Sequence, residues 1–176
     1  MSTVLSTRRV FLRPVSEEDA ELLAEWRNTK HYLEFISSRE RRNYQTQFLV
    51  CLKKNNKSIG VVYTFAHNKN DGYMFLSVFL VDGYRRVGYG IEACALMVCH
   101  TFENFPIYKI YCDAFSSNTQ SISMMRGAGL QQEGFFVGHR LYNGKRYDVI
   151  RFAVHQKDLA FAKVLVEKFN RSKQTD

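Results

Sequence analysis

Long apolar runs are absent from this sequence of 176 residues. No stretch reaches the roughly 18 to 20 apolar residues that cross a bilayer, and the polar start MSTVLSTRRV lacks the apolar centre of a signal peptide. The sequence therefore predicts a protein that has no membrane partner and is located in the cytoplasm. Internal repeats and interdomain linkers are absent too, so we expect one domain over residues 1–176.

Cysteine patterns that bind metals or form a disulfide framework are also missing. The four cysteines form no CxxC pair and no zinc pattern with a histidine. Cys51, Cys94, Cys99 and Cys112 lie within apolar segments instead. We interpret them as reduced, mostly buried thiols, and we expect no metal.

Several nucleotide-binding signatures are lacking. No GKS or GKT follows a glycine loop, the first glycine of GxGxxG is missing, and no RNA-recognition or zinc-finger pattern occurs. The formal charge of +8, from 25 basic against 17 acidic residues, nevertheless favours anionic partners. Because the basic residues are spread along the chain, a nucleic-acid partner is not favoured, while an acidic protein or a phosphorylated cofactor stays open.

Alternation, helical periodicity and turn residues predict the order of elements. Ser16 and Asp19 form a capping-box pattern before a helix, and Asn143 with Gly144 is a strong hairpin signal. Strands are expected at 8–14, 47–53, 58–66, 73–81, 107–115, 130–142 and 145–155, and helices at 16–28, around 37–47, at 88–103, 118–129 and 157–170. This order predicts an α/β (α+β) protein whose mixed, mostly antiparallel twisted sheet of about seven strands is flanked by helices.

A glycine-rich basic loop follows the third central strand, in the stretch VFLVDGYRRVGYGIEACALMVCHTF. Gly83, Gly88 and Gly90 allow backbone angles that other residues disfavour, and a helix that starts near Gly88 presents unpaired N–H groups to an anion. Arg85 and Arg86 add guanidinium groups that pair with phosphate oxygens. A phosphorylated ligand is therefore favoured, and a turn that binds nothing is the alternative.

The loop sequence YRRVGYG resembles a known family motif. Arg85, Gly88 and Gly90 match the pattern Gln/Arg-x-x-Gly-x-Gly/Ala of the GNAT superfamily of acetyl-CoA-dependent N-acetyltransferases. The resemblance extends over residues 8–154 in the order and spacing of elements. It implies the GNAT fold, acetyl-CoA as cosubstrate and an amine acceptor.

A second segment, YKIYCDAFSSNTQSISMMRGAGLQQEG, resembles the strand and the NxxSxxxxxxxxGF helix of the RimJ/RimL-like branch. Asn118, Ser121 and Gly129 are in place, and Leu130 stands where that motif has an aromatic residue. The resemblance implies that Asn118 contacts the cofactor and that Ser121 assists the departing sulfur as a catalytic residue. A serine on the helix surface is the alternative interpretation.

The same resemblance assigns the cofactor-binding residues. The strand end at Leu80 and Val81 would pair with the pantetheine arm, and one of its N–H groups would face the thioester oxygen. The backbone amides of the loop and helix start would hold the pyrophosphate of coenzyme A, and these residues are Arg86, Val87, Gly88, Tyr89, Gly90 and Ile91. Arg85 belongs to the same cofactor-binding motif.

Two departures from the family pattern leave the general base unassigned. Phe75 stands where this branch often has a glutamate, and Met125 where many GNAT enzymes have a tyrosine. Neither side chain transfers a proton. The candidate bases are Glu34, Asp113, Asp148 or a chain of waters, and the expected walls of the acceptor site are His139, Tyr142 and the segment 26–36.

Three functions are compatible with these features. The leading one is transfer of an acetyl group to a primary amine of a small molecule, such as an amino sugar, or of a protein N-terminus, by direct attack. Because the protein is positively charged, polyamines are less favoured than acceptors with an anionic part. The alternatives are a CoA-binding sensor or scaffold without turnover and a basic ribosome-associated or nucleic-acid-associated protein. The C-terminal helix 157–170 would cap the domain or form a homodimer contact.

Overall fold

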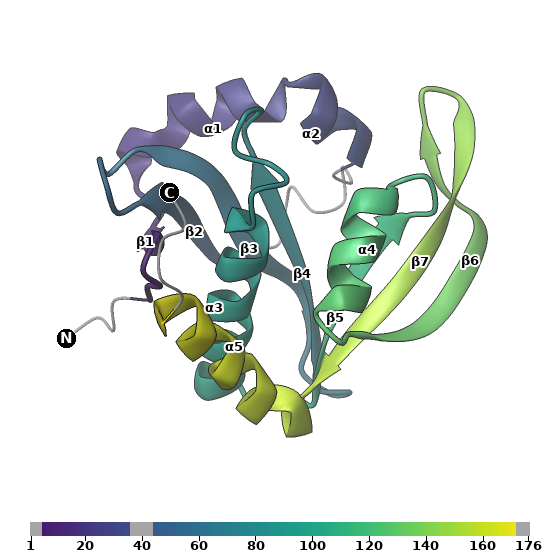
Figure 1. Ribbon diagram of the computed structural model, residues 1–176. Helices are drawn as coiled ribbons and strands as arrows, with labels where there is room; N and C mark the ends of the chain where they lie inside the picture. Colours follow the sequence, from purple (N-terminus) through teal and green to yellow (C-terminus); the bar gives the residue numbers. More distant parts are fainter. Residues whose placement is uncertain (1–4, 36–43, 172–176) are drawn as a thin grey trace.

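A seven-stranded sheet forms the centre of the protein, in the order β1-β2-β3-β4-β5-β7-β6 (Figure 1). The computed structural model describes residues 5–35 and 44–171. The chain runs in the order β1 (Val10–Pro14), α1 (Ala20–Arg27), α2 (Lys30–Phe35), β2 (Tyr44–Leu52), β3 (Ser58–Asn68), β4 (Tyr73–Leu80), α3 (Tyr89–Asn104), β5 (Lys109–Phe115), α4 (Thr119–Gly127), β6 (Gln131–Tyr142), β7 (Lys145–His155) and α5 (Leu159–Arg171), with short 3₁₀ turns at Glu17–Asp19 and Gln156–Asp158. The predicted fold class is confirmed.

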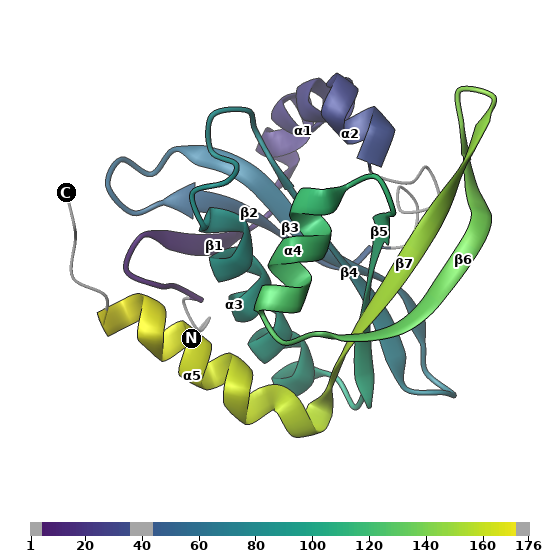
Figure 2. The same cartoon turned by 45° about the vertical axis from the view of Figure 1, so that its right-hand side comes forward.

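The sheet is antiparallel except between β4 and β5, which run parallel. Their register joins Tyr73–Phe75 to Lys109–Tyr111, and the pairing ends at these residues although both strands continue. Beyond these residues the two strands separate. This opening in the middle of the sheet lies beside α3 and α4 in both ribbon views (Figures 1 and 2).

Helices cover both faces of the sheet. Helices α1 and α2 cover one face, where Trp26 and Tyr32 pack against Phe79 of β4. Helices α3 and α5 cover the other, with a core that includes Met97 and Ala162. Burial of these apolar side chains is the main stabilising contribution, at about 25 cal/mol per Å² of apolar surface removed from water.

Local sequence signals explain several element boundaries. The Asp19 carboxylate accepts the Ser16 backbone N–H at 2.8 Å, so the predicted capping box is confirmed. Asn143 and Gly144 both have positive φ, 47° and 73°, as a two-residue hairpin turn requires. The β6–β7 hairpin that they close projects beside the rest of the sheet (Figure 1).

The prediction of a helix around 37–47 is wrong for residues 44–47. Residues 37–43 lie outside the described part of the chain, and residues from Tyr44 onward belong to strand β2. Tyr44 pairs with Phe65 and Thr46 with Thr64 of β3, so strand pairing outweighs the polar composition of this segment. The short helix α2 lies earlier, at Lys30–Phe35.

The part of the chain that the structure describes contains no helix long and apolar enough to cross a membrane.

Candidate functional site

The glycine loop lies between β4 and α3, as the sequence predicts. Gly88 is the N-cap of α3 and has a φ of 93°, in the left-handed region where an L side chain is strained. A Cβ at this position would lie 2.8 Å from Arg9 Nη2. The N–H groups of the first turn of α3 have no acceptor within the helix, so this end of α3 can bind an anion.

Buried polar contacts between the chain before β1 and the first turn of α3 support the glycine loop. The Glu92 side chain, in the first turn of α3, is 1% exposed and accepts hydrogen bonds from Arg9 Nε at 2.6 Å and Thr7 Oγ1 at 2.5 Å. Arg9 also donates to the Val87 carbonyl at 3.1 Å and lies 4.7 Å from the centre of the Tyr89 ring. The sequence analysis missed this support. A glutamate within an otherwise apolar helix was the available signal.

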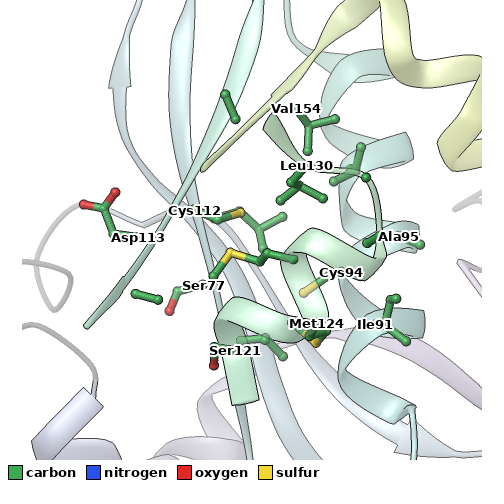
Figure 3. Close-up of a pocket in the computed structure, with 18 of the residues that line it drawn as sticks. Ser77, Ile91, Cys94, Ala95, Cys112, Asp113, Ser121, Met124, Leu130 and Val154 are labelled. Atoms are coloured by element: carbon green, nitrogen blue, oxygen red, sulfur yellow. The ribbon is translucent and has the colours of Figure 1, made fainter. Parts of the chain in front are cut away.

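A cavity of about 310 Å³ lies next to the opening between β4 and β5. Figure 3 shows Cys94, Met124 and Leu130 around the same interior, while Asp113 points to the other side of β5. The cavity is mainly apolar, and its lining includes Val78 of β4, Ile91, Cys94 and Val98 of α3, Cys112 of β5, Ser121 and Met124 of α4, and Phe161 and Leu165 of α5.

The predicted site residues fall into two groups. Ile91, Asn118 and Ser121 line the cavity. The others do not line it and form the strand end and loop that lead to it: Leu80, Val81, Arg85, Arg86, Val87, Gly88, Tyr89 and Gly90. The two groups lie close together, because a Cβ on Gly90 would lie 3.5 Å from Leu80 Cδ1 and 3.9 Å from Met124 Sδ.

The backbone of β4 limits which N–H groups face the opening. The N–H of Val81 donates to the Ile59 carbonyl of β3 at 2.9 Å, so it is directed away from β5. Because N–H groups of successive strand residues point to opposite sides, those of Leu80 and Val78 are directed toward the opening. Leu80 and Val78, rather than Val81, therefore present donors there.

Asn118 and Ser121 are placed by the start of α4. Asn118 is the N-cap, and its Oδ1 accepts the Ser121 N–H at 3.1 Å, which satisfies one donor of the first turn. This contact fixes Ser121 one turn into the helix, at the wall of the cavity. Nearby, Arg86 Nε donates to Gln120 Oε1 at 3.2 Å and so joins the glycine loop to α4.

Arg85 connects the loop to helix α2. Its Nη1 lies 2.8 Å from Nδ1 of His31, and its Nη2 forms an ion pair with Asp82. Because a guanidinium only donates, Nδ1 of His31 accepts, which places the proton of the neutral ring on Nε2. Burial, with the nearby Arg85 charge, lowers the pKa of His31 to about 4. His31 also lines the cavity, and it belongs to the segment 26–36 that the sequence analysis expected at the acceptor site.

The candidate bases occupy different environments. Asp113 accepts hydrogen bonds from Arg151 Nε at 2.8 Å and Nη2 at 2.9 Å, so both of its oxygens are engaged. Asp148 accepts the Gly138 backbone N–H at 2.7 Å. Glu34 lies in α2, but its side chain is outside the part that the structure describes.

The expected acceptor walls are found only in part. His31 of the segment 26–36 lines the cavity, whereas Trp26 is 4% exposed and belongs to the core under α1. His139 and Tyr142 lie on the β6–β7 hairpin and do not line this cavity.

The cavity cysteines are poor nucleophiles. Burial raises the pKa of Cys94 to about 12 and the pKa of Cys112 well above its usual value. Thiols in this environment carry little thiolate at neutral pH. In residues 5–35 and 44–171, no group of three or more His, Cys, Asp or Glu side chains is placed to hold a metal ion.

A mixed sheet that opens at its parallel pair, beside a glycine loop and a helix start, places this protein in the α/β class, with its candidate site at the opening. Comparison with family models then assigns it further. The chain belongs to the acetyltransferase (GNAT) domain family, whose model matches residues 9–131. A search of curated proteins gives no match.

Solved structures share this fold. A GCN5-related N-acetyltransferase from Brucella melitensis has a TM-score of 0.77 at 15% identity, covering 96% of this chain and 85% of its own. Spermidine N-acetyltransferase from Vibrio cholerae, solved with CoA and spermine, has a TM-score of 0.76 at 16% identity, covering 86% and 98%. A GNAT-family acetyltransferase from Bacillus anthracis has a TM-score of 0.74 at 18% identity, covering 88% and 99%. At these identities the likeness shows the fold alone.

Proposed function

We propose that this protein transfers the acetyl group of acetyl-CoA to a primary amine of a small molecule, such as an amino sugar, or of a protein N-terminus. The observation that carries the proposal is the position of Gly88. Gly88, with its positive φ, is the N-cap of α3, and Ile91 in the first turn of that helix lines the same cavity as Ser121. One end of this arrangement suits a pyrophosphate, and the other suits a thioester.

The cofactor would extend from the loop into the opening. The amides from Arg86 to Ile91 would hold the pyrophosphate, and Arg85 and Asn118 would contact the cofactor nearby. The pantetheine arm would pair with the free edge of β4 as an added strand does. In this arrangement the N–H groups of Leu80 and Val78 are the donors available to the thioester oxygen. The N–H of Val81 is not available, because it donates to the Ile59 carbonyl of β3.

The chemistry would be direct attack of the amine on the thioester carbon. Aligned N–H donors stabilise the negative charge that develops on the thioester oxygen, and one such donor commonly contributes a few kcal/mol. Ser121 would donate a hydrogen bond to the departing sulfur. An acyl-cysteine intermediate is not favoured, because burial raises the pKa of Cys94 to about 12.

Several further expectations stay predictions that rest on the sequence. They are membership of the RimJ/RimL-like branch, a single domain over residues 1–176, a cytoplasmic location and a homodimer contact through the C-terminal helix.

The test is release of free CoA from acetyl-CoA, measured with a panel of amino sugars, sugar-nucleotide amines, antibiotics, polyamines and peptides with varied N-termini. We expect release with at least one class. Phe75 and Met125 specifically favour a second candidate, a CoA-binding sensor, because neither transfers a proton. Tight acetyl-CoA binding without release, lost in Gly88→Glu, would support the sensor. Absence of acetyl-CoA binding would overturn both.

A further inference from the structure

Ser77 lies in the part of β4 that borders the opening in the sheet. The pairing of β4 with β5 ends at Phe75, and Ser77 is two residues further along the strand. On its other edge β4 stays paired with β3, where Ser77 is opposite Tyr63. The backbone of Ser77 is therefore held by β3 on one edge, while the other edge of β4 is open to the cavity.

The side chain of Ser77 points to the face of the sheet that α1 and α2 cover. Successive strand residues point to opposite faces, and the neighbours Leu76 and Val78 pack in the core under α3, whereas Phe79 belongs to the core under α1. Ser77 lines the large cavity (Figure 3). It also lines a recess of about 20 Å³ with Phe65 on the α1 and α2 side. The recess has room for about one water, so it indicates the direction of the side chain and is too small to hold an acceptor.

The hydroxyl of Ser77 is available to a ligand. Within residues 5–35 and 44–171, no group forms a hydrogen bond with Ser77 Oγ. Other hydroxyls of the chain are engaged, such as Thr29 Oγ1, which donates to the Trp26 carbonyl at 2.7 Å. A serine hydroxyl has one donor and two acceptor lone pairs. Ser77 can therefore accept a hydrogen bond at the opening.

The neighbouring polar groups at the opening are already engaged. Both oxygens of Asp113 accept hydrogen bonds from Arg151, at 2.8 and 2.9 Å. Nδ1 of His31 accepts from Arg85 at 2.8 Å. Ser121 reaches the cavity from α4, on the opposite face of the sheet from the Ser77 side chain. On the face where an acceptor would approach, Ser77 thus offers an uncharged acceptor that these contacts leave unused.

We propose that Ser77 Oγ accepts a hydrogen bond from the attacking amine and directs the amine lone pair toward the thioester carbon. The proposal rests on the proposed function. The N–H of Val78, the next residue, is one of the donors available to the thioester oxygen, so an amine that arrives from the α1 and α2 side passes Ser77. In the reaction the amine nitrogen forms a bond with the acetyl carbon, the carbon–sulfur bond breaks, and one amine proton ends on the sulfur of CoA. Ser77 keeps its own proton throughout.

The hydrogen bond to Ser77 should matter most in the transition state. The amine nitrogen gains positive charge as it attacks, and a hydrogen bond from a charged donor is stronger than one from a neutral donor. Ser77→Ala should therefore lower kcat roughly tenfold or more, while the Kd of acetyl-CoA in calorimetry stays within about twofold. The CoA-release assay on the full chain uses glucosamine, phenylalaninamide and a peptide with a free N-terminal amine as acceptors.

Two variants of nearly equal size separate the hydroxyl from packing. Ser77→Thr and Ser77→Val both place a β-branched side chain on the strand, which strands accommodate well, and they differ in a hydroxyl against a methyl group. We expect Ser77→Thr to keep a kcat roughly tenfold above that of Ser77→Val. Thermal unfolding checks that each variant is folded, and the Thr and Val pair decides the question if Ser77→Ala is not.

Thr64→Val is the matched control on the neighbouring strand. Thr64 is paired with Leu76, and its Oγ1 is buried without a partner among the described residues. Because paired residues share a face, its hydroxyl lies on the α3 side of the sheet, and Thr64 does not line the cavity. Thr64→Val removes a hydroxyl close to the opening but on the other face, so kcat should stay within about twofold.

The pH dependence distinguishes orientation from proton transfer. Because Ser77 orients the amine and takes no proton, Ser77→Ala should lower kcat/KM for the amine by the same factor at every pH between about 7 and 9. Loss of a general base would change the shape of this profile instead. A changed shape would therefore overturn the proposed role.

The failure of this inference can be told apart from the failure of acetyl transfer. If an amine is acetylated and Ser77→Ala keeps the kcat of the unmodified protein, or if Ser77→Thr and Ser77→Val behave alike, Ser77 does not hold the amine and acetyl transfer stands. The same conclusion follows if Ser77→Ala weakens acetyl-CoA binding as much as it lowers kcat, or if Thr64→Val loses as much. If none of the amines releases CoA although acetyl-CoA binds, the proposed function fails, and the role of Ser77 fails with it.

Discussion

Arg9 and Glu92 are 83 residues apart in the sequence, yet Arg9 Nε donates a hydrogen bond of 2.6 Å to the Glu92 carboxylate. The pair ties the chain just before β1 to the first turn of α3. Arg9 also holds the Val87 carbonyl at 3.1 Å, so the contact supports the glycine loop directly. The carboxylate near the helix start is favoured by the helix dipole as well.

The two partners should respond unequally to substitution. Glu92 is 1% exposed, whereas Arg9 is 44% exposed. Arg9→Ala leaves a buried carboxylate without its main partner, so we expect a loss of roughly 3 kcal/mol in the free energy of unfolding. Glu92→Gln leaves a cation that can reach water, so its cost should be smaller. Urea unfolding of both variants measures the difference, and equal costs would contradict this account.

Gly88→Ala should weaken acetyl-CoA binding by roughly tenfold or more. The φ of 93° is strained for alanine, and the new Cβ would lie 2.8 Å from Arg9 Nη2, so either the loop or the Arg9 guanidinium that holds the Val87 carbonyl must shift. The matched control is Gly144→Ala, which also has a positive φ, 73°, but has open space around the added Cβ in the β6–β7 turn. Calorimetric titration with acetyl-CoA should show a loss for Gly88→Ala alone. Equal affinities would mean that the loop does not hold the cofactor.

Most of the fold could be predicted because its signals are local. The Ser16 and Asp19 capping box, the Asn143–Gly144 turn and the alternation along the strands each depend on residues within a few positions. The failed prediction around 37–47 shows the limit. Tyr44 and Thr46 join β2 because Phe65 and Thr64 of β3 lie beside them, and no local pattern contains that information.

The site could be predicted only where a motif lies on consecutive residues. The glycine loop and the Asn118–Ser121 cap belong to this class. The contacts of Arg9 with Glu92 and of Arg85 with His31 join distant segments, and the direction of the Val81 N–H depends on its pairing with Ile59. Such features follow from tertiary structure, so the sequence alone could not supply them.

The depressed pKa of His31 should make stability depend on pH. Burial, with Arg85 beside it, lowers this pKa from 6.5 to about 4 in the folded protein. Between these values the unfolded chain binds more protons, so the free energy of unfolding falls as the pH drops from about 6.5 toward about 4. His31→Gln should reduce this slope in urea unfolding at several pH values.

A control separates His31 from the other titrating groups that face it. Arg85 donates a hydrogen bond to Nδ1 of His31 and forms an ion pair with Asp82, and Asp113 lines the same cavity as His31. These three charges remain in His31→Gln. His139→Gln removes an exposed histidine of β6 instead. If His139→Gln changes the slope as much as His31→Gln does, the contact with Arg85 has no special effect on stability.

Acetyl transfer should proceed without an acyl-enzyme. Cys94 lines the cavity, but burial raises its pKa to about 12, so the thiolate is scarce near pH 7. Cys94→Ala should keep most of the activity, and the intact mass of the wild-type protein should not change when acetyl-CoA is added without an acceptor. A stable acetyl adduct that disappears in Cys94→Ala would contradict direct attack.

Ser121→Ala should lower kcat with little change in the KM for acetyl-CoA. The hydroxyl lines the cavity, and a hydrogen bond to a sulfur that gains negative charge is stronger in the transition state than before it, so roughly a tenfold loss of kcat is expected. Ser123→Ala is the matched control, because Ser123 lies in the same helix, is exposed and does not line the cavity. Steady-state kinetics of CoA release would compare the two variants after thermal unfolding confirms that both are folded. If the two serines behave alike, Ser121 is a structural residue of α4, and the departing sulfur must be protonated by another group, such as the incoming ammonium itself.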